Sequence, residues 1–307
     1  MNLILQVYRY PFSSDLSEEE RKKKEQRHTE LDFCFQINAS HSFVKRMIIF
    51  YEKEEDKVYY EGLLGPHSSK ATFVKHHKQP HYKDFLVYIR DTMPENEVCC
   101  ILASDIYMNF DIDTEFFGTF LPVNTVFGLT RHEPTDKFHT VCDETSCGLI
   151  HSAGGCADCF IFRTPIPQGF DYDRVDHKQN RWGGECSFLS AWHQAGAKIL
   201  NPCFQVKTIH LHHNNEHFNI DPKRITYGRP YLPDLEPAPP DSYHCINRPC
   251  ALYLPGTLYC FRCYAHPNLF CKWHKGGKDW TCSICEMYNK FEERDWARYR
   301  ALHPESV

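Results

Sequence analysis

The sequence predicts an α/β protein: a three-layer α/β/α sandwich with a mainly parallel sheet, followed by a small C-terminal module stabilised by zinc. The sandwich is predicted because strand-like apolar runs alternate with helical segments over residues 1 to about 225, which is the pattern of βαβ units. The module is predicted because seven of the 16 cysteines lie between His244 and Cys285. That segment is too small and too rich in cysteine to rest on an apolar core alone.

The elements of the sandwich are predicted from the spacing of their apolar residues. A first strand over Leu3–Tyr10 precedes a helix that begins in the charged stretch Ser17–Arg27 and continues to Ala39. The charges of that stretch are typical of a solvated helix face and predict no further role. The remaining strands are predicted at Arg46–Glu52, Glu97–Ala103, Thr125–Thr130, Cys159–Arg163 and Phe204–Leu211, and the remaining helices at Tyr82–Arg90 and Cys186–Ala195.

The composition along the chain predicts two domains and a linker. Residues 1–227 are expected to form one α/β domain. Residues 228–243 contain Pro230, Pro233, Pro237, Pro239 and Pro240, a density that favours a stiff, extended linker. Residues 244–307 are expected to form the cysteine- and histidine-rich zinc-binding module, which ends in a charged helix.

The overall composition excludes several classes of protein. Hydrophobic residues make up 42% and charged residues 24% of the chain, which excludes a largely disordered protein. No apolar run reaches the length of about 18 residues that a membrane span requires, and the N-terminus lacks the pattern of a secretion signal. We therefore expect a soluble, cytoplasmic protein with reduced thiols and no membrane span. The net charge of −5 predicts no nucleic-acid partner.

Seven C-terminal cysteines and one histidine form four closely spaced pairs. Zinc prefers four tetrahedral sulfur or nitrogen ligands, and a two-residue gap lets one turn aim two side chains at one ion. The eight donors therefore predict two structural zinc ions, and the spacing is compatible with sequential or cross-braced pairing. The pairs are Cys245 with Cys250, Cys260 with Cys263, Cys271 with His274, and Cys282 with Cys285.

The four pairs resemble the cross-braced binuclear modules of the RING and PHD type. In those modules the first and third pairs share one ion, and the second and fourth pairs share the other. The longer gap in the first pair and the position of the single histidine depart from those families, so their ubiquitin-ligase and histone-tail activities are not expected here. The module is predicted to be a structural staple or a binding site for a protein partner.

A second set of cysteines lies inside the first domain. Cys142, Cys147, Cys156 and Cys159 predict either a third zinc site in an inserted loop or ordinary buried thiols.

A candidate ligand site follows the most apolar predicted strand. In an α/β sheet, ligands bind beyond the carboxyl ends of the strands. Asp105 stands at such a position, directly after the apolar run Val98–Ala103. A carboxylate there is suited to a divalent ion on the diphosphate of a nucleotide, although an aspartate after a strand can also simply cap a turn.

Seven short motifs surround this position in a characteristic order. They are Tyr82-Lys-Asp-Phe, Ala103-Ser-Asp-Ile-Tyr107, Gly128-Leu-Thr-Arg131, Asp158-x-Phe-Ile-Phe-Arg163, Gly183-Gly-Glu-Cys186, Asn201-Pro202 and Lys207-Thr-Ile-His-Leu-His212. Over roughly residues 1 to 220 their order resembles the GT-A class of nucleotide-diphospho-sugar transferases. The resemblance implies a GT-A-like sandwich, a nucleotide-sugar donor, and a Mn or Mg ion on the donor diphosphate.

The resemblance also implies which residues hold the donor. Asp105 matches the aspartate that binds metal and nucleotide, and Tyr107 of the same motif is expected beside the donor. The second carboxylate that the family places four residues on is Asn109 here, with Asp111 and Asp113 shortly after.

Two arginines at predicted strand ends are further candidates for donor binding. The guanidinium forks of Arg131 and Arg163 are suited to phosphate or sugar hydroxyls. Both arginines can equally form surface ion pairs.

Two carboxylates are the candidate catalytic groups. Asp158 matches an aspartate that faces the sugar, and Glu185 matches the carboxylate that deprotonates the acceptor hydroxyl. Cys186 stands where the family more often has an aspartate.

Two histidines are candidates for the metal site. His210 and His212 lie two residues apart on a predicted strand and therefore point to the same side. The resemblance implies that a histidine here completes the metal site, and the alternative is a pair of polar surface residues.

We therefore predict a glycosyltransferase that moves a sugar from a nucleotide-sugar donor to a hydroxyl of a glycan, protein or small-molecule acceptor. The missing carboxylates at Asn109 and Cys186 leave a second hypothesis open, a non-catalytic zinc-stapled adaptor built on a degenerate transferase domain. A hydrolase with a catalytic zinc is disfavoured, because the C-terminal ligands pair completely and leave no open coordination position.

Overall fold

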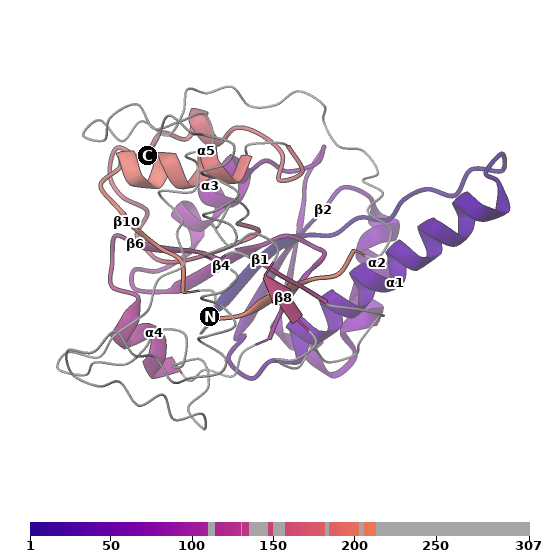
Figure 1. Ribbon diagram of the computed structural model, residues 1–307, viewed down its shortest axis with the longest axis horizontal. Helices are drawn as coiled ribbons and strands as arrows, with labels where there is room; N and C mark the ends of the chain where they lie inside the picture. The colour runs from indigo at the N-terminus through magenta and orange to yellow at the C-terminus, as the bar shows by residue number, and fades with distance from the viewer. Residues whose placement is uncertain are drawn as a thin grey trace, which may run out of the picture.

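A seven-stranded sheet forms the centre of the molecule (Figure 1). The computed structural model describes residues 1–109, 114–129, 131–134, 147–149, 157–181, 184–202 and 206–212. The sheet has the order β10-β6-β9-β4-β1-β2-β3. Its strands are β1 (Asn2–Gln6), β2 (Arg46–Tyr51), β3 (Ala71–Lys75), β4 (Val98–Leu102), β6 (Thr125–Leu129), β9 (Cys159–Arg163) and β10 (Lys198–Leu200).

The sheet is parallel except at β9. Strand β1 pairs in parallel with β2 and β4, β2 with β3, and β6 with β10. Strand β9 runs antiparallel between β4 and β6, so that Cys159 at its start faces Leu102 and Leu129 at the ends of its neighbours. The residue before β9 therefore lies at the edge of the sheet where the parallel strands end, which is the edge where ligands bind in such sheets.

Helices cover both faces of the sheet (Figure 1). On one face lie α1 (Glu18–Ser40) and α2 (Glu54–Leu64), and on the other lie α3 (Tyr82–Thr92) and α5 (Gly184–Gln194). Successive strand residues alternate between the two cores: Leu3 and Leu5 pack on the α1 and α2 side, and Ile4 packs on the α3 and α5 side. The predicted three-layer α/β/α sandwich with a mainly parallel sheet is confirmed.

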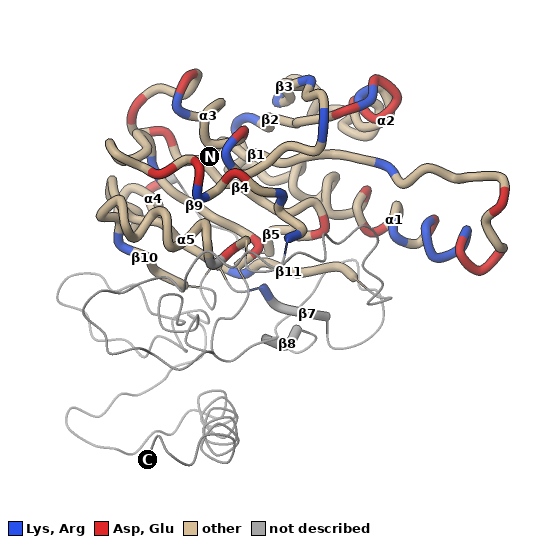
Figure 2. Tube along the Cα trace, turned by 90° about the horizontal axis from the view of Figure 1, so that it is seen from above, with Lys and Arg blue, Asp and Glu red and all other residues tan. Residues whose placement is uncertain are grey.

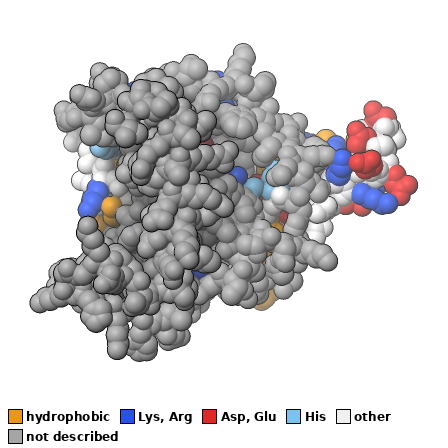
Figure 3. All heavy atoms as spheres, in the orientation of Figure 1, with side chains coloured by type: hydrophobic (Ala, Val, Ile, Leu, Met, Phe, Trp, Pro, Cys, Tyr) orange, Lys and Arg blue, Asp and Glu red, His pale blue; other side chains and the backbone are white. Residues whose placement is uncertain are grey.

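Helix α1 extends well beyond the sandwich (Figure 2). It begins with a capping box, in which the Ser17 hydroxyl accepts a hydrogen bond from the Glu20 backbone N–H and the Glu20 carboxylate accepts one from that of Ser17. Its first turns carry exposed ion pairs between Glu18 and Lys22 and between Glu19 and Lys23, and Figure 3 shows acidic and basic side chains intermixed at this end. The prediction of a solvated charged face is correct for these turns.

A second, smaller sheet packs beside α1. Its order is β5-β11-β7-β8, and its strands are β5 (Ile106–Met108), β11 (Thr208–His210), β7 (His132–Pro134) and β8 (Cys147–Leu149). Strand β11 is shorter than the predicted strand over Phe204–Leu211 and lies in this sheet, which the sequence pattern did not predict. The remaining described helices are α4 (Thr114–Phe120) and two short 3₁₀ helices at Gly65–Lys70 and Asp173–Val175.

Some of the predicted features lie outside the described residues. These are the proline-rich linker over 228–243, the module over 244–307 with its eight predicted zinc ligands, and the two cysteines Cys142 and Cys156. Cys159 lies in the core as a free thiol, with its Sγ 3.5 Å from the Sγ of Cys100. Within the described ranges, no helix is long and apolar enough to cross a membrane.

Trp192 of α5 offers a test of the core on the α3 and α5 side. Its indole is 1% exposed, and its ring centroid lies 4.7 Å from that of Phe162 and 5.1 Å from that of Phe170. Replacing Trp192 with Ala should lower the free energy of unfolding by about 4 kcal/mol, because a large buried side chain leaves a cavity. Replacing it with Phe should cost only about 1 kcal/mol, because Phe retains most of the packing and removes a buried indole N–H that has no acceptor. Urea unfolding of both variants checks this difference, and equal losses would contradict it.

Candidate active site

Backbone hydrogen bonds join three chain segments at the edge of the main sheet. The Ala103 N–H, just beyond β4, donates to the Asp158 carbonyl at 3.0 Å. The Leu211 N–H, just beyond β11, donates to the Asp105 carbonyl at 2.9 Å. Backbone hydrogen bonds therefore hold the segments that carry Asp105, Asp158 and the end of β11 close together. This proximity does not depend on their side chains.

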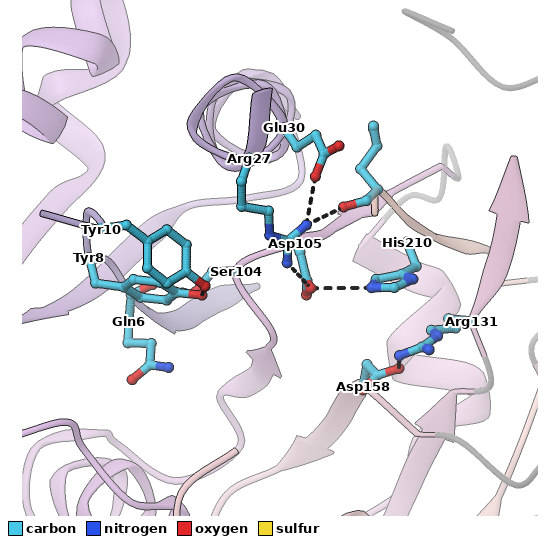
Figure 4. A network of polar contacts seen from close by, with 11 residues as sticks. Gln6, Tyr8, Tyr10, Arg27, Glu30, Ser104, Asp105, Arg131, Asp158 and His210 are labelled. Atoms are coloured by element: carbon cyan, nitrogen blue, oxygen red, sulfur yellow. Dashed lines mark hydrogen bonds and ion pairs between the residues drawn. The ribbon is translucent and has the colours of Figure 1, made fainter. Parts of the chain in front are cut away.

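Asp105 is held by one cation and one histidine (Figure 4). Its Oδ2 accepts a hydrogen bond from Nη2 of Arg27 on α1 and lies 3.2 Å from Nε2 of His210. Burial alone would raise the pKa of Asp105, but the Arg27 guanidinium and the His210 ring hold that pKa well below its usual range. The Asp105 carboxylate therefore stays ionised.

Asp105, His210 and His212 form a cluster of three potential metal ligands. One potential ligand atom from each residue lies within 4.8 Å of those of the other two, and the two imidazole centroids are 5.3 Å apart. One carboxylate oxygen and two imidazole nitrogens at this separation fit the first coordination shell of a divalent transition metal. The structure thus brings together the three residues that sequence reasoning assigned to the metal.

A second cluster lies near the first and contains the two candidate catalytic carboxylates. Nη1 of Arg131 donates a hydrogen bond of 2.7 Å to Oδ2 of Asp158, and Figure 4 shows this pair beside His210. Glu185, in the first turn of α5, is close enough to both for their charges to act on it. Burial of the carboxyl group and the charge of the nearby Asp158 raise the pKa of Glu185 to about 8, against the opposing charge of Arg131.

Tyr82, at the start of α3, lies close enough to Glu185 and Asp158 for their charges to act on its hydroxyl. Its side chain is 2% exposed. Burial and the charges of Glu185 and Asp158 raise the pKa of Tyr82 well above its usual range. Its hydroxyl therefore remains a neutral hydrogen-bonding group.

Arg27 and Glu30 belong to the site, and sequence reasoning missed them. The prediction that the charges of Ser17–Arg27 have no further role is wrong at Arg27, whose side chain is 7% exposed and touches Asp105. The available signal was helical spacing: Arg27 lies four residues before the buried Leu31, so it continues the inward stripe of α1. A charged residue on such a stripe indicates a buried ion pair.

Arg163 and Tyr107, which were expected to bind the nucleotide-sugar donor, lie away from this cluster or are packed in the core. Arg163 is at the end of β9, and because β9 is antiparallel this places it opposite Val98 at the other edge of the sheet. Its guanidinium donates to the carbonyls of Leu121, Asn96 and Phe117 at 3.0, 2.8 and 2.9 Å. Tyr107 is 2% exposed and packs in a small apolar cluster with Cys34, Ile209 and Leu211. The structure therefore assigns both side chains to the fold.

Asn109 stands where the resemblance implies a second carboxylate. The Asn109 backbone N–H donates to the Lys207 carbonyl at 2.9 Å, which fixes the chain beyond β5. Asp111 and Asp113 lie outside the described residues, and so does the side chain of Cys186.

The C-terminal segment is similar to a known zinc finger. Residues 258–294 match the family model of the Sec23/Sec24 zinc finger. The matched segment contains the second, third and fourth of the four predicted pairs, and Cys245 and Cys250 lie before it. No curated protein matches the chain.

Several solved structures show a distant likeness to part of this chain. HddC from Yersinia pseudotuberculosis aligns over 57% of this chain and 78% of its own, with 11% identity and a TM-score of 0.31. A putative glucose-1-phosphate thymidylyltransferase from Bacillus anthracis aligns over 65% and 85%, with 10% identity and a TM-score of 0.33. A 4-diphosphocytidyl-2C-methyl-D-erythritol synthase aligns over the same shares, with 9% identity and a TM-score of 0.32. Likeness at this level carries no information on what this chain binds.

The placement of Arg163 leads to a prediction about stability. Arg163→Met should lower the free energy of unfolding by about 2 to 4 kcal/mol, because three backbone carbonyls lose charged donors. Addition of Mn²⁺ should affect this variant as it affects the wild type, because Arg163 lies at the opposite edge of the sheet from Asp105. Urea unfolding and Mn²⁺ titration of the same variant check both parts, and an altered response to Mn²⁺ with unchanged stability would contradict the structural role of Arg163.

Proposed function

We propose that this chain is a glycosyltransferase that moves a sugar from a nucleotide-sugar donor to an acceptor hydroxyl. The best support is that two groups of side chains lie close together at one edge of the main sheet. One is the cluster of three potential metal ligands, Asp105, His210 and His212. The other is the carboxylate pair of Asp158 and Glu185. The ordered sequence motifs, which resemble those of GT-A transferases, agree with this assignment.

Asp105, His210 and His212 would hold a Mn or Mg ion. Their two nitrogen donors favour Mn²⁺ over Mg²⁺, which prefers oxygen ligands and retains its water. When bound, such an ion supplies positive charge for the diphosphate of the donor and for the leaving nucleoside diphosphate. The chain's own contribution is a carboxylate that Arg27 and His210 keep ionised.

Glu185 is the proposed general base. The acceptor oxygen forms a bond to the anomeric carbon of the donor sugar while the bond from that carbon to the diphosphate oxygen breaks. The hydroxyl proton moves to the Glu185 carboxylate, and the bonding electrons leave with the nucleoside diphosphate. Arg131 holds the Asp158 carboxylate in place through its 2.7 Å hydrogen bond, so that Asp158 presents a fixed acceptor for sugar hydroxyls.

The C-terminal segment would bind zinc and serve as a binding site for a protein partner. Cys260, Cys263, Cys282 and Cys285 all lie within the matched zinc-finger segment, and two Cys-x₂-Cys pairs separated by 18 residues suit one tetrahedral ion. We propose that these four share one zinc. Cys245, Cys250, Cys271 and His274 would then hold the second zinc, which corresponds to cross-braced pairing.

The first test is the release of nucleoside diphosphate. Zinc-loaded full-length protein is incubated with UDP-, GDP- and other sugar nucleotides, with and without Mn²⁺, and free nucleoside diphosphate is measured. Slow, Mn²⁺-dependent release from one donor class supports the transferase. Binding of a donor without release, or no binding of any donor, would contradict the transferase and favour the non-catalytic adaptor.

Replacing Asp105 with Asn tests the metal and diphosphate role. Turnover should fall by at least about 100-fold, because the carboxylate charge for the metal is lost. The fold should persist, because the Asn carbonyl can still accept the Arg27 hydrogen bond. The matched control is Glu54→Gln, which makes the same chemical change in an exposed ion pair with Lys75 and should leave turnover unaltered. Equal turnover of the two variants would contradict the role of Asp105.

The raised pKa of Glu185 predicts a pH dependence. A base must be deprotonated, so the turnover rate should increase as the pH rises through about 8. Glu185→Gln should reduce turnover by at least about 100-fold and abolish this increase. In the unfolded chain Glu185 titrates near its ordinary pKa of 4.5, so the folded state is favoured by protonation. The wild type should therefore lose stability relative to Glu185→Gln as the pH rises from about 5 to 8. A flat rate profile over pH 6 to 9 would exclude Glu185 as the base.

A further inference from the structure

We propose that Arg27 and Glu30 of α1 are positioning residues for the cation site, which fix the geometry of Asp105, His210 and His212 and set its net charge. This inference rests on the proposed function, because it assumes that Asp105, His210 and His212 bind a divalent cation. Helix α1, which carries Arg27 and Glu30, contributes none of these three ligands.

The Arg27 guanidinium contacts both chain segments that supply the donors. Its Nη2 donates to Oδ2 of Asp105, and its Nη1 donates to the Leu211 carbonyl at 2.6 Å. Leu211 lies between His210 and His212, so this single planar group fixes the carboxylate and the backbone between the two imidazoles. Arginine suits this task because its donors have a fixed relative geometry.

The contact with Arg27 also sets the orientation of the Asp105 carboxylate. Arg27 and His210 both contact Oδ2. A carboxylate whose one oxygen is held from two sides cannot rotate freely, so the direction of its other oxygen is fixed as well. Partners of this kind, which contact a ligand residue and not the ion itself, typically change metal affinity by about 10- to 100-fold.

Glu30 corrects the charge of the network. Arg27 alone would neutralise Asp105 and leave the cluster with no attraction for a cation. The Glu30 carboxylate lies 2.8 Å from Nη1 of Arg27, and the side chains of Glu30 and Arg27 are only 1% and 7% exposed. With Asp105, whose side chain is 21% exposed, one positive and two negative charges remain in a mostly buried network that water screens less than it screens surface charges. The network therefore keeps one net negative charge for a divalent ion.

The arrangement differs from an ordinary anchor between a helix and a sheet. The same helix carries such an anchor two to three turns further along, where Nδ2 of Asn38 donates to the Ile106 carbonyl at 2.8 Å and Oδ1 of Asn38 accepts from the Met108 N–H at 2.9 Å. Asn38 holds β5 against α1 but does not contact the three donors. It therefore provides a matched control for loss of stability alone.

The test is the affinity of the zinc-loaded full chain for Mn²⁺, measured without substrate from the electron paramagnetic resonance signal of free Mn²⁺. Glu30→Gln keeps a hydrogen-bond acceptor for Arg27 and removes one negative charge, and it should weaken Mn²⁺ binding by about 10-fold. The double variant R27M/E30M removes one charge of each sign together with the positioning contacts, and it should weaken binding by about 10- to 100-fold. It should still fold, because a buried ion pair can be replaced by apolar side chains of similar volume. Asn38→Ala should lower the thermal midpoint and change the affinity less than about twofold.

The outcomes separate this inference from the proposed function. If Asp105→Asn abolishes Mn²⁺ binding but E30Q and R27M/E30M bind Mn²⁺ as tightly as the wild type, the positioning role is wrong and the cation site stands. If Asn38→Ala weakens binding as much as the double variant, the effect is a general loss of stability, and the inference is also wrong. If the wild type binds no Mn²⁺, or Asp105→Asn binds it unchanged, the cation site of the proposed function fails and this inference fails with it.

Discussion

The buried contact between Arg27 and Asp105 is the interaction on which the site depends. It joins α1, the loop after β4 and the end of β11, three segments that are far apart in the sequence. A lone buried carboxylate would take up a proton and lose its charge. With Arg27 beside it, Asp105 remains ionised, and with Glu30 beside Arg27 the network retains a negative charge. A cation site at this edge of the sheet therefore depends on a helix that the sequence presents as a solvated, charged surface.

The antiparallel strand β9 is the second constraint. In an all-parallel sheet the end of each strand lies at one edge, and Arg163 would then have joined Arg131. Because β9 is reversed, its first residues lie at that edge, and Asp158 meets Arg131 and Glu185 there. The same reversal takes Arg163 to the opposite edge, where it holds three carbonyls and supports the fold. One change in strand direction thus decides which end of a single motif belongs to the candidate site.

Local patterns predicted the sandwich. The apolar run before Asp105 and the two-residue spacing of His210 and His212 pointed to three residues whose side chains the structure brings together. The direction of β9 is set by pairing with β4 and β6, and no local spacing encodes it. Arg27 was missed because the charged run Ser17–Arg27 was taken as one solvated face, although helical periodicity turns part of it inward. Glu30 was missed with it, because its partner is Arg27. Tyr107 was missed as a core residue because the second sheet, which buries it against α1, forms from segments about a hundred residues apart.

The proposed function requires that Asp105, His210 and His212 bind one divalent cation that contacts the diphosphate of a nucleotide. The most direct measurement is anomalous X-ray scattering from crystals of the full chain grown with Mn²⁺ and a nucleoside diphosphate. We expect one strong manganese peak within coordination distance of an oxygen of Asp105 and ring nitrogens of both histidines, with phosphate oxygens completing the shell. A nucleotide bound at this edge without manganese between these three side chains, or a manganese peak only elsewhere in the molecule, would show that these residues do not form the cation site.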